Sequence, residues 1–360
     1  MKKLSLLSIL FLSAKLLAQL PPAAQALYNE FASIPSQSAQ VCINAGATAS
    51  ATADGKTFYM KWFPSGATPS LTPLMVGLHG SGGNAFLMMA KHLQSAQSQS
   101  VGMICLQWYL GSSSSAPNDY FGDTTLYTYI DTALKRIKYP KNKALYHGFS
   151  RGSARSYALQ FLDVYPGVGK NYFCTIMSNA GKPDSAYPFF QAVNSPTNTN
   201  HSFCKGKKWA MFCGGLDPNP GRDGCPGMNS AKTNWVQANG GSVGLFIQDP
   251  NLAHTGFVDT PTYIDSLFKF YKPCFQSGVQ GLNENHSEHE FKIFPNPVQD
   301  HLNLSTKNLK GETLTIYDCL GVLRKQIKIE GAETTIDVSE FQKGIYFIEL
   351  GRSRAKFVRD

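Results

Sequence analysis

One pentapeptide has the form of a catalytic serine motif: residues 148–152 read Gly-Phe-Ser-Arg-Gly. Residues 145–147 before it favour a strand, and residues 153–162 after it favour a helix. A strand that turns sharply into a helix exposes the serine hydroxyl above the sheet, and the flanking glycines avoid clashes with its neighbours. The helix N-terminus also favours negative charge beside the serine. The pattern predicts Ser150 as a nucleophile.

A nucleophilic serine needs a general base, and His254 has the position that the motif requires. In serine–acid–histidine elbows the base follows a late strand. His254 lies after a strand candidate at 243–248 and before a closing helix at 263–271. The remaining histidines lie in other loops, on a helix, on the nucleophile strand or in the tail. We therefore expect His254 to take the serine proton.

The base in turn needs a carboxylate that orients it. Asp217 follows the strand candidate 209–213, at the edge where ligands gather in open α/β sheets. Asp223 lies further along the same loop, and Asp249 lies only five residues before His254. Asp217 is the preferred acid, with the other two as alternatives.

A glycine-rich loop, His79 to Gly83, is the expected oxyanion loop. Such a hole combines the backbone N–H after the nucleophile, here that of Arg151, with one from an earlier loop. We expect the second donor to be the N–H of Ser81 or Gly80. Loss of one donor typically costs about 3 kcal/mol in the barrier. No Lys-Ser or Lys-Thr pair follows this loop, so it is not a Walker phosphate loop.

Four aromatic residues flank a serine-rich loop near residue 110. Trp108 and Tyr109 precede the loop, and Tyr120 and Phe121 follow it. Trp108 and Tyr109 are candidate substrate-binding residues, as part of a platform for an acyl or sugar group. Ordinary packing explains these residues equally well, and both interpretations stay open.

Short apolar runs alternate with helical segments from residue 55 to residue 272, which predicts a mostly parallel sheet with helices on both faces. From residue 291 onward, short alternating strands predict a small all-β, sandwich-like domain. Between them, residues 278–290 have no apolar periodicity and favour a linker. His286 and His289 are expected to be solvated there. The other expected strands are 55–63, 74–78, 103–108 and 172–177, and the other expected helices are 127–137 and 229–238.

The N-terminus has the order of a signal peptide in residues 1–18: two lysines, an apolar run and a small residue. The run is too short for a permanent membrane span. The net charge of +9 lies in no basic cluster, so nucleic acid is not an expected partner. No Cys-x-x-Cys pair or His-x-x-x-His spacing appears, so no structural zinc is expected, and we expect no cofactor.

Export makes the eight cysteines candidates for disulfides. Cys105 and Cys174 lie inside apolar strand candidates and are expected to be buried thiols. Cys204, Cys213 and Cys225 flank the loop of Asp217, and a bridge there would brace it. The pairing itself does not follow from the sequence.

Residues 55–272 resemble the α/β-hydrolase superfamily. Within it, the His79 loop, the Gly-Phe-Ser elbow and residues 179–183 (NAGKP) are similar to secreted polyhydroxybutyrate-depolymerase and feruloyl-esterase-like enzymes. The resemblance implies a serine esterase with the triad Ser150, Asp217 and His254. Arg151 departs from the small or apolar residue common in esterases, and would meet either an acidic substrate group or a nearby carboxylate.

Residues 291–360 resemble a second family, the type IX secretion sorting domain of Bacteroidetes. Residues 294–297 (FPNP) open the pattern, and a basic run at 356–359 ends it. The resemblance implies Sec export, transport across the outer membrane by the type IX machinery and removal of the tail, so that the protein is secreted or cell-surface. A carbohydrate-binding β-module is the rival interpretation.

The expected function is ester hydrolysis, on a substrate such as a polyester or a polysaccharide-linked ester. Two alternatives are a serine peptidase on the same fold and a non-catalytic binding protein that retains the fold. Residues 188–208 leave room for a short excursion but not for a large lid, which suits a bulky substrate.

Overall fold

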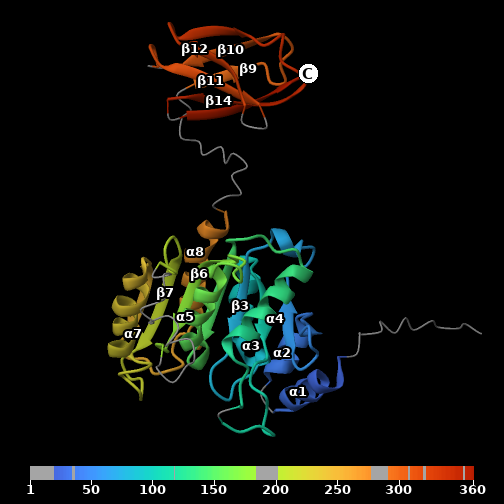
Figure 1. Ribbon diagram of the computed structural model, residues 1–360, viewed down its shortest axis with the longest axis vertical. Helices are drawn as coiled ribbons and strands as arrows, with labels where there is room; N and C mark the ends of the chain where they lie inside the picture. The colour runs from blue at the N-terminus through green and yellow to red at the C-terminus, as the bar shows by residue number, and fades with distance from the viewer. Residues whose placement is uncertain are drawn as a thin grey trace, which may run out of the picture. The chain divides into compact units, whose positions relative to one another are not determined.

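The computed structural model describes residues 20–34, 37–116, 118–183, 202–276, 291–306, 309–318, 322–351 and 353–360. The chain forms two compact units, residues 1–279 and 280–360 (Figure 1). A signal peptide at 1–18 and a linker at 278–290 predict a catalytic domain over 19–277 and a sorting domain over 291–360, and these boundaries stay predictions. Several expectations lie outside the described residues: the signal peptide, the linker with His286 and His289, most of segment 188–208, His201 and Cys319.

The large unit contains an eight-stranded sheet in the order β1-β2-β4-β3-β5-β6-β7-β8. Only β1–β2 and β2–β4 pair antiparallel; all later neighbours are parallel. This order, with one reversed strand near the edge, is the α/β-hydrolase arrangement, so the predicted fold class is confirmed. The strands are Thr48–Ala51, Phe58–Trp62, Leu74–Leu78, Gly102–Leu106, Ala144–Phe149, Phe173–Asn179, Lys208–Gly214 and Ser242–Asp249.

Helices cover both faces of this sheet. Successive strand residues point to opposite faces of the sheet. Two neighbouring residues of β5 therefore identify one helix on each face. His147 contacts His92 of α3, whereas the Tyr146 hydroxyl donates to Gly152 O in α5. The helices are α1 (Pro22–Ser33), α2 (Ser38–Asn44), α3 (Ala85–Gln99), α4 (Asp123–Arg136), α5 (Arg151–Val164), α7 (Cys225–Ala231) and α8 (Pro261–Gln276); short turns lie at Pro69–Leu71, Lys232–Val236 and Gln237–Asn239.

The chain reverses its direction across the sheet between β3 and β5. From β3 it moves to β4 on one side and then returns to β5 on the other. Ligands bind at such switch points, at the carboxyl ends of the strands. The His79 loop follows β3 and Ser150 follows β5, so the topology brings the two predicted elements to one crevice.

Two disulfides join described cysteines. Cys213 at the end of β7 is bonded to Cys225 at the start of α7, which confirms the expected brace of the Asp217 loop. Cys174 of β6 is bonded to Cys274 of α8, so the expectation of a thiol at Cys174 is wrong. An apolar strand pattern shows burial, but it does not show a partner 100 residues away. Cys105 is a buried thiol, as predicted.

A pair of buried histidines lies beneath the crevice. His92 Nδ1 donates to Met88 O, so its Nε2 accepts from His147 Nδ1, 2.9 Å away. Burial lowers the pKa of His92 to about 4, and burial and the neighbouring ring hold the pKa of His147 well below its ordinary value. Burial also lowers the pKa of His79 to about 4. All three rings are therefore neutral at pH 7.

These neutral histidines predict acid sensitivity of the fold. Unfolded histidine has a pKa of about 6.5, so below that pH the unfolded chain binds protons that the folded chain does not. Stability is full above about pH 6.5 and falls toward pH 4, by about 1.4 kcal/mol per pH unit for each such histidine. Thermal unfolding at pH 7.5, 6 and 5 should show falling midpoints. His92→Gln should flatten this slope, and a midpoint independent of pH would contradict the assignment.

The small unit is a pair of antiparallel sheets, as predicted. Their strand orders are β13-β10-β9 and β12-β11-β14-β15. Alternate apolar residues of both sheets, such as Leu304, Ile316 and Phe357, are buried between them. The strands are Phe291–Phe294, His301–Thr306, Thr313–Asp318, Leu323–Lys328, Glu333–Asp337, Gly344–Leu350 and Ser353–Arg359.

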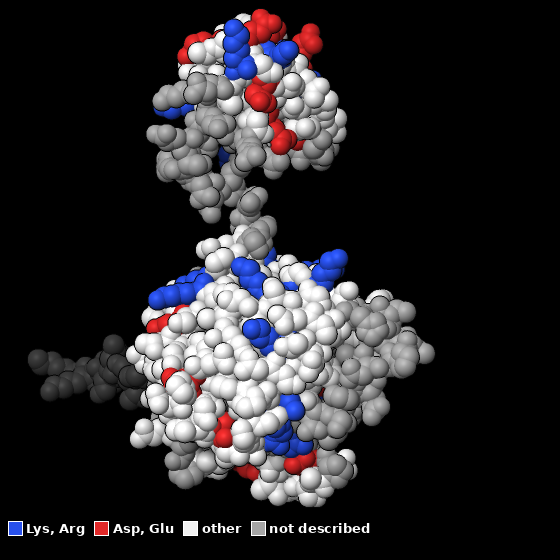
Figure 2. Space-filling model, turned by 90° about the vertical axis from the view of Figure 1, so that its left-hand side faces the viewer, with Lys and Arg blue, Asp and Glu red and all other residues white. Residues whose placement is uncertain are grey.

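Charged side chains are dispersed on the face of the large unit drawn in Figure 2. Lys and Arg lie among acidic and uncharged residues there, without one continuous basic patch. Within the described residues, no helix combines the length and apolar character needed to cross a membrane.

Candidate active site

Ser150 lies at a strained turn between β5 and α5. Its φ of 54° and ψ of −116° are rare for a residue with a side chain. Both flanking glycines are required by space: a Cβ at Gly148 would lie 2.1 Å from Gly152 O, and one at Gly152 would lie 2.3 Å from Leu78 O. The sequence GFSRG therefore folds as the predicted elbow.

The end of β6 and the residues that follow it also hold this turn. The Ser150 N–H donates to Asn179 O at 2.8 Å. Gly181 approaches so closely that a Cβ there would lie 2.2 Å from Ser150 O. Strained backbone persists only where its surroundings over-determine it, and these contacts supply that constraint.

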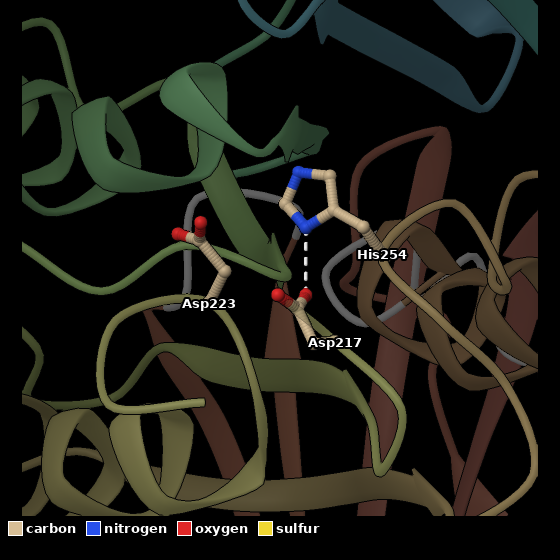
Figure 3. A group of neighbouring side chains, drawn as sticks. All are labelled: Asp217, Asp223 and His254. Carbon is tan, nitrogen blue, oxygen red and sulfur yellow. Dashed lines mark hydrogen bonds and ion pairs between the residues drawn. The ribbon is translucent and has the colours of Figure 1, made fainter. Parts of the chain in front are cut away.

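The structure brings the three predicted triad residues together. His254 Nε2 lies 2.8 Å from Ser150 Oγ, and His254 Nδ1 lies 2.7 Å from Asp217 Oδ2. Figure 3 shows the imidazole above the Asp217 carboxylate. The Asp217 side chain is fully buried, whereas that of His254 is 25% exposed. The ring is thus fixed at one nitrogen and presents the other to the serine.

Backbone hydrogen bonds tie the acid loop to the histidine loop. The N–H groups of Gly215 and Leu216 donate to Asp249 O and Leu252 O at 2.7 and 3.0 Å. The other Asp217 oxygen, Oδ1, accepts the N–H of Asn219 at 2.8 Å. The Cys213–Cys225 disulfide closes the base of the same loop. The acid is therefore fixed both by its loop and by its second oxygen.

The two alternative acids have other partners. Asp223 accepts from the Arg222 guanidinium at 2.6 Å, although its carboxylate is near the site (Figure 3). Asp249 accepts from the Tyr263 hydroxyl at 2.5 Å, which holds its pKa below the ordinary value. Neither is the carboxylate bonded to His254.

Asp217, Asp223 and His254 each offer one ligand atom within 4.8 Å of the others. A cation there would compete with the His254–Asp217 hydrogen bond and with Arg222, because those groups already engage the same atoms. The arrangement fits a triad acid and base, and we assign no metal to it.

The predicted oxyanion loop lies against the nucleophile. A Cβ at Gly80 would lie 2.9 Å from Ser150 Cβ, so glycine is required for this approach. Gly80 is buried and Ser81 is exposed. The Arg151 N–H belongs to the first turn of α5, where backbone donors have no acceptor within the helix. Gly80 and Arg151, which carry two of the candidate donors, thus both adjoin Ser150.

The predicted aromatic platform divides into two parts. Trp108 is fully buried, and its Nε1 donates to His79 O at 3.0 Å, so packing describes it better than a solvent-facing platform. Tyr109 is half-buried and its ring lies 5.1 Å from that of Tyr120. Its role in substrate binding stays a prediction.

The Arg151 side chain packs against Tyr120. Its guanidinium carbon lies 4.0 Å from the Tyr120 ring centroid, and Nη1 lies 4.0 Å from Asp119 Oδ2. Of the two partners expected for Arg151, the structure shows the nearby carboxylate, at the long end of ion-pair distances.

Residues 292–359 match the family described as the secretion system C-terminal sorting domain. The match spans nearly the whole small unit. This part of the chain is a secretion sorting domain. A sorting domain marks its carrier for a secretion system, and its two sheets are described above.

Solved esterases are among the structures to which this chain is similar, at low identity. The Bacillus cereus carboxylesterase is 16% identical, with a TM-score of 0.44 over 67% of this chain and 100% of that one. Esterase LipW from Mycobacterium marinum is 13% identical, with a TM-score of 0.45 over 67% and 85%. The Pyrobaculum calidifontis esterase is 11% identical, with a TM-score of 0.46 over 71% and 94%. No curated protein matches the sequence.

Three residues that fix the candidate site, Asn179, Gly181 and Tyr120, were not predicted in that role from the sequence. Asn179 and Gly181 were noted only within a family-like segment, and Tyr120 only as one aromatic residue among four. The signal for Asn179 and Gly181 was available, since one ends the strand next to the nucleophile strand and the other lies just after it. The contact between Tyr120 and the His79 loop joins residues 38 apart and left no local pattern.

Proposed function

We propose that the large unit is a serine hydrolase that cleaves carboxylic esters through an acyl-enzyme. The observation that supports this most is the hydrogen-bonded series from Ser150 Oγ through His254 to Asp217, with distances of 2.8 and 2.7 Å. The location of Ser150 on a strained elbow at the switch point of the sheet adds support, because strained turns cluster at active sites and ligands bind at switch points.

In this mechanism Ser150 Oγ attacks the ester carbonyl while His254 Nε2 takes the serine proton. Asp217 keeps the Nδ1 proton in place and stabilises the imidazolium. The negative oxygen of the tetrahedral intermediate accepts hydrogen bonds from the N–H of Arg151 and of Ser81 or Gly80. His254 then protonates the leaving alcohol. Water, activated by His254, releases the acid and restores Ser150.

A direct assay of the full chain tests this function. Short p-nitrophenyl acyl esters should be hydrolysed, and aminoacyl p-nitroanilides should not. Cleavage of the anilides alone would favour the serine peptidase. Turnover of neither, with polyester films and feruloylated polysaccharide included as polymeric substrates, would favour a binding protein with this fold.

We also propose that the signal peptide and the sorting domain together take the enzyme out of the cell or to its surface. Deletion of residues 291–360 should trap active enzyme in the periplasm, because the domain that the secretion system recognises is absent. Immunoblots of periplasm, outer membrane and medium measure this. Equal secretion of the truncated and full chains would refute it.

A further inference from the structure

The glycine-rich loop at 79–84 has few side chains of its own to fix it. Gly82 has a φ of +65°, which favours glycine, and is exposed. Within the loop, Gly83 N–H and His79 Nδ1 both donate to Gly80 O, at 3.1 and 2.9 Å. These bonds shape the turn, but they do not attach it to the rest of the site.

Two aromatic side chains make that attachment. The Tyr120 hydroxyl accepts the Gly82 N–H at 2.7 Å, and Trp108 Nε1 donates to His79 O at 3.0 Å. Their rings lie 4.6 Å apart. The loop is thus held near both of its ends by one aromatic pair.

Tyr120 is itself fixed by a short backbone ribbon. Leu110 N–H donates to Asp119 O at 2.9 Å, and Phe121 N–H donates to Trp108 O at 3.1 Å. Tyr109 and Tyr120 form a bridge within this ribbon. The hydrogen-bonded backbone of this ribbon therefore fixes where the Tyr120 hydroxyl lies relative to the loop.

Arg151 connects this ribbon to the nucleophile. It directly follows Ser150, and its guanidinium lies 4.0 Å from the Tyr120 ring centroid. Arg151, whose N–H is one expected oxyanion donor, therefore packs on Tyr120. Tyr120 in turn holds the loop that carries the other expected donor. The two halves of the expected oxyanion hole are joined through one contact.

We propose that Tyr120 and Arg151 are positioning residues that hold the glycine-rich loop at the nucleophile. This rests on the proposed ester hydrolase and deepens it. The pair acts on the donors that meet the negative oxygen, which is present only in the transition state and intermediate. Loss of the contact should lower kcat and leave KM nearly unchanged.

Tyr120→Phe removes the hydroxyl that accepts the Gly82 N–H and keeps the ring, so it tests this hydrogen bond alone. Removing a complete oxyanion donor costs about 100- to 1000-fold in kcat, so loosening the loop is expected to cost about tenfold. Hydrogen–deuterium exchange of peptides covering 79–84 should become faster. Tyr172→Phe is the matched control, because it loses a hydroxyl bonded to Asp131 at 2.8 Å, next to the amino end of β6, whereas Ser150 follows the carboxyl end of β5.

Arg151→Met provides the second variant, and it carries the test if Tyr120→Phe does not fold. It keeps packing on Tyr120 and removes the cation. The kcat of the double variant should lie within about twofold of the kcat of the slower single variant, because both substitutions act through one contact. Additive losses, an unchanged kcat in Tyr120→Phe or a rise confined to KM would overturn the proposal.

The exchange measurement separates this proposal from the proposed function. If the wild-type chain hydrolyses no ester, the hydrolase is refuted, whereas faster exchange in Tyr120→Phe would still show that the loop is held. If the wild-type chain is active and both variants match it in exchange and kcat, the positioning role alone is refuted.

Discussion

Replacement of Ser150 by alanine is expected to lower kcat for p-nitrophenyl esters by about a millionfold, as for other triad serines. The variant keeps the elbow backbone, since alanine fits wherever serine does, but it has no atom to form the acyl-enzyme. KM should change little. A steady-state assay with highly purified protein measures the loss, and circular dichroism shows that the fold is intact.

Ser266→Ala is a matched control. Its hydroxyl donates to Thr262 O within α8 and makes no bond to Ser150, His254 or Asp217. It should retain full activity. A fluorophosphonate probe should label the wild type and Ser266→Ala but not Ser150→Ala. Labelling of Ser150→Ala, or turnover equal to that of the wild type, would exclude Ser150 as the nucleophile.

Asp217→Asn is expected to lower kcat by about ten-thousandfold, the loss seen when a triad acid becomes an amide. The Asn amide can present a donor to His254 Nδ1, which favours the tautomer with its proton on Nε2. That nitrogen then cannot take the serine proton. The same substitution keeps the size of the side chain, so stability should fall far less than activity.

Asp223→Asn and Asp249→Asn separate the three candidate acids. Each should reduce kcat by less than about tenfold, because neither carboxylate is bonded to His254 and asparagine keeps an oxygen that can accept from Arg222 or Tyr263. Their kcat values and those of Asp217→Asn are measured on one ester at one pH. A loss in Asp223→Asn as large as that in Asp217→Asn would assign the acid to Asp223.

Much of the fold could be predicted because each buried strand and its following helix are local patterns. The elbow is the clearest case: the glycines at 148 and 152 are dictated by contacts that the motif itself implies. The order of Asp217 and His254 after late strands followed in the same way. These features depend on the chain a few residues to either side.

Features that depend on distant contacts were not predicted, or were predicted wrongly. The Cys174–Cys274 bond requires α8 to pack on β6, and no local pattern contains that fact. The burial of Trp108 follows from its position beneath the His79 loop. The bond from Gly82 to Tyr120 likewise depends on where a serine-rich loop folds back.

The Cys213–Cys225 disulfide bears on when, in the proposed enzyme, the loop of Asp217 can close. The bond encloses Asp217, while Ser150 and His254 lie outside the enclosed segment. Thiols stay reduced in the cytosol and are oxidised after export. During synthesis the nucleophile and base can therefore fold on a chain whose acid loop is still open. In the proposed enzyme, closure of the acid loop by this disulfide would therefore follow export from the cytosol.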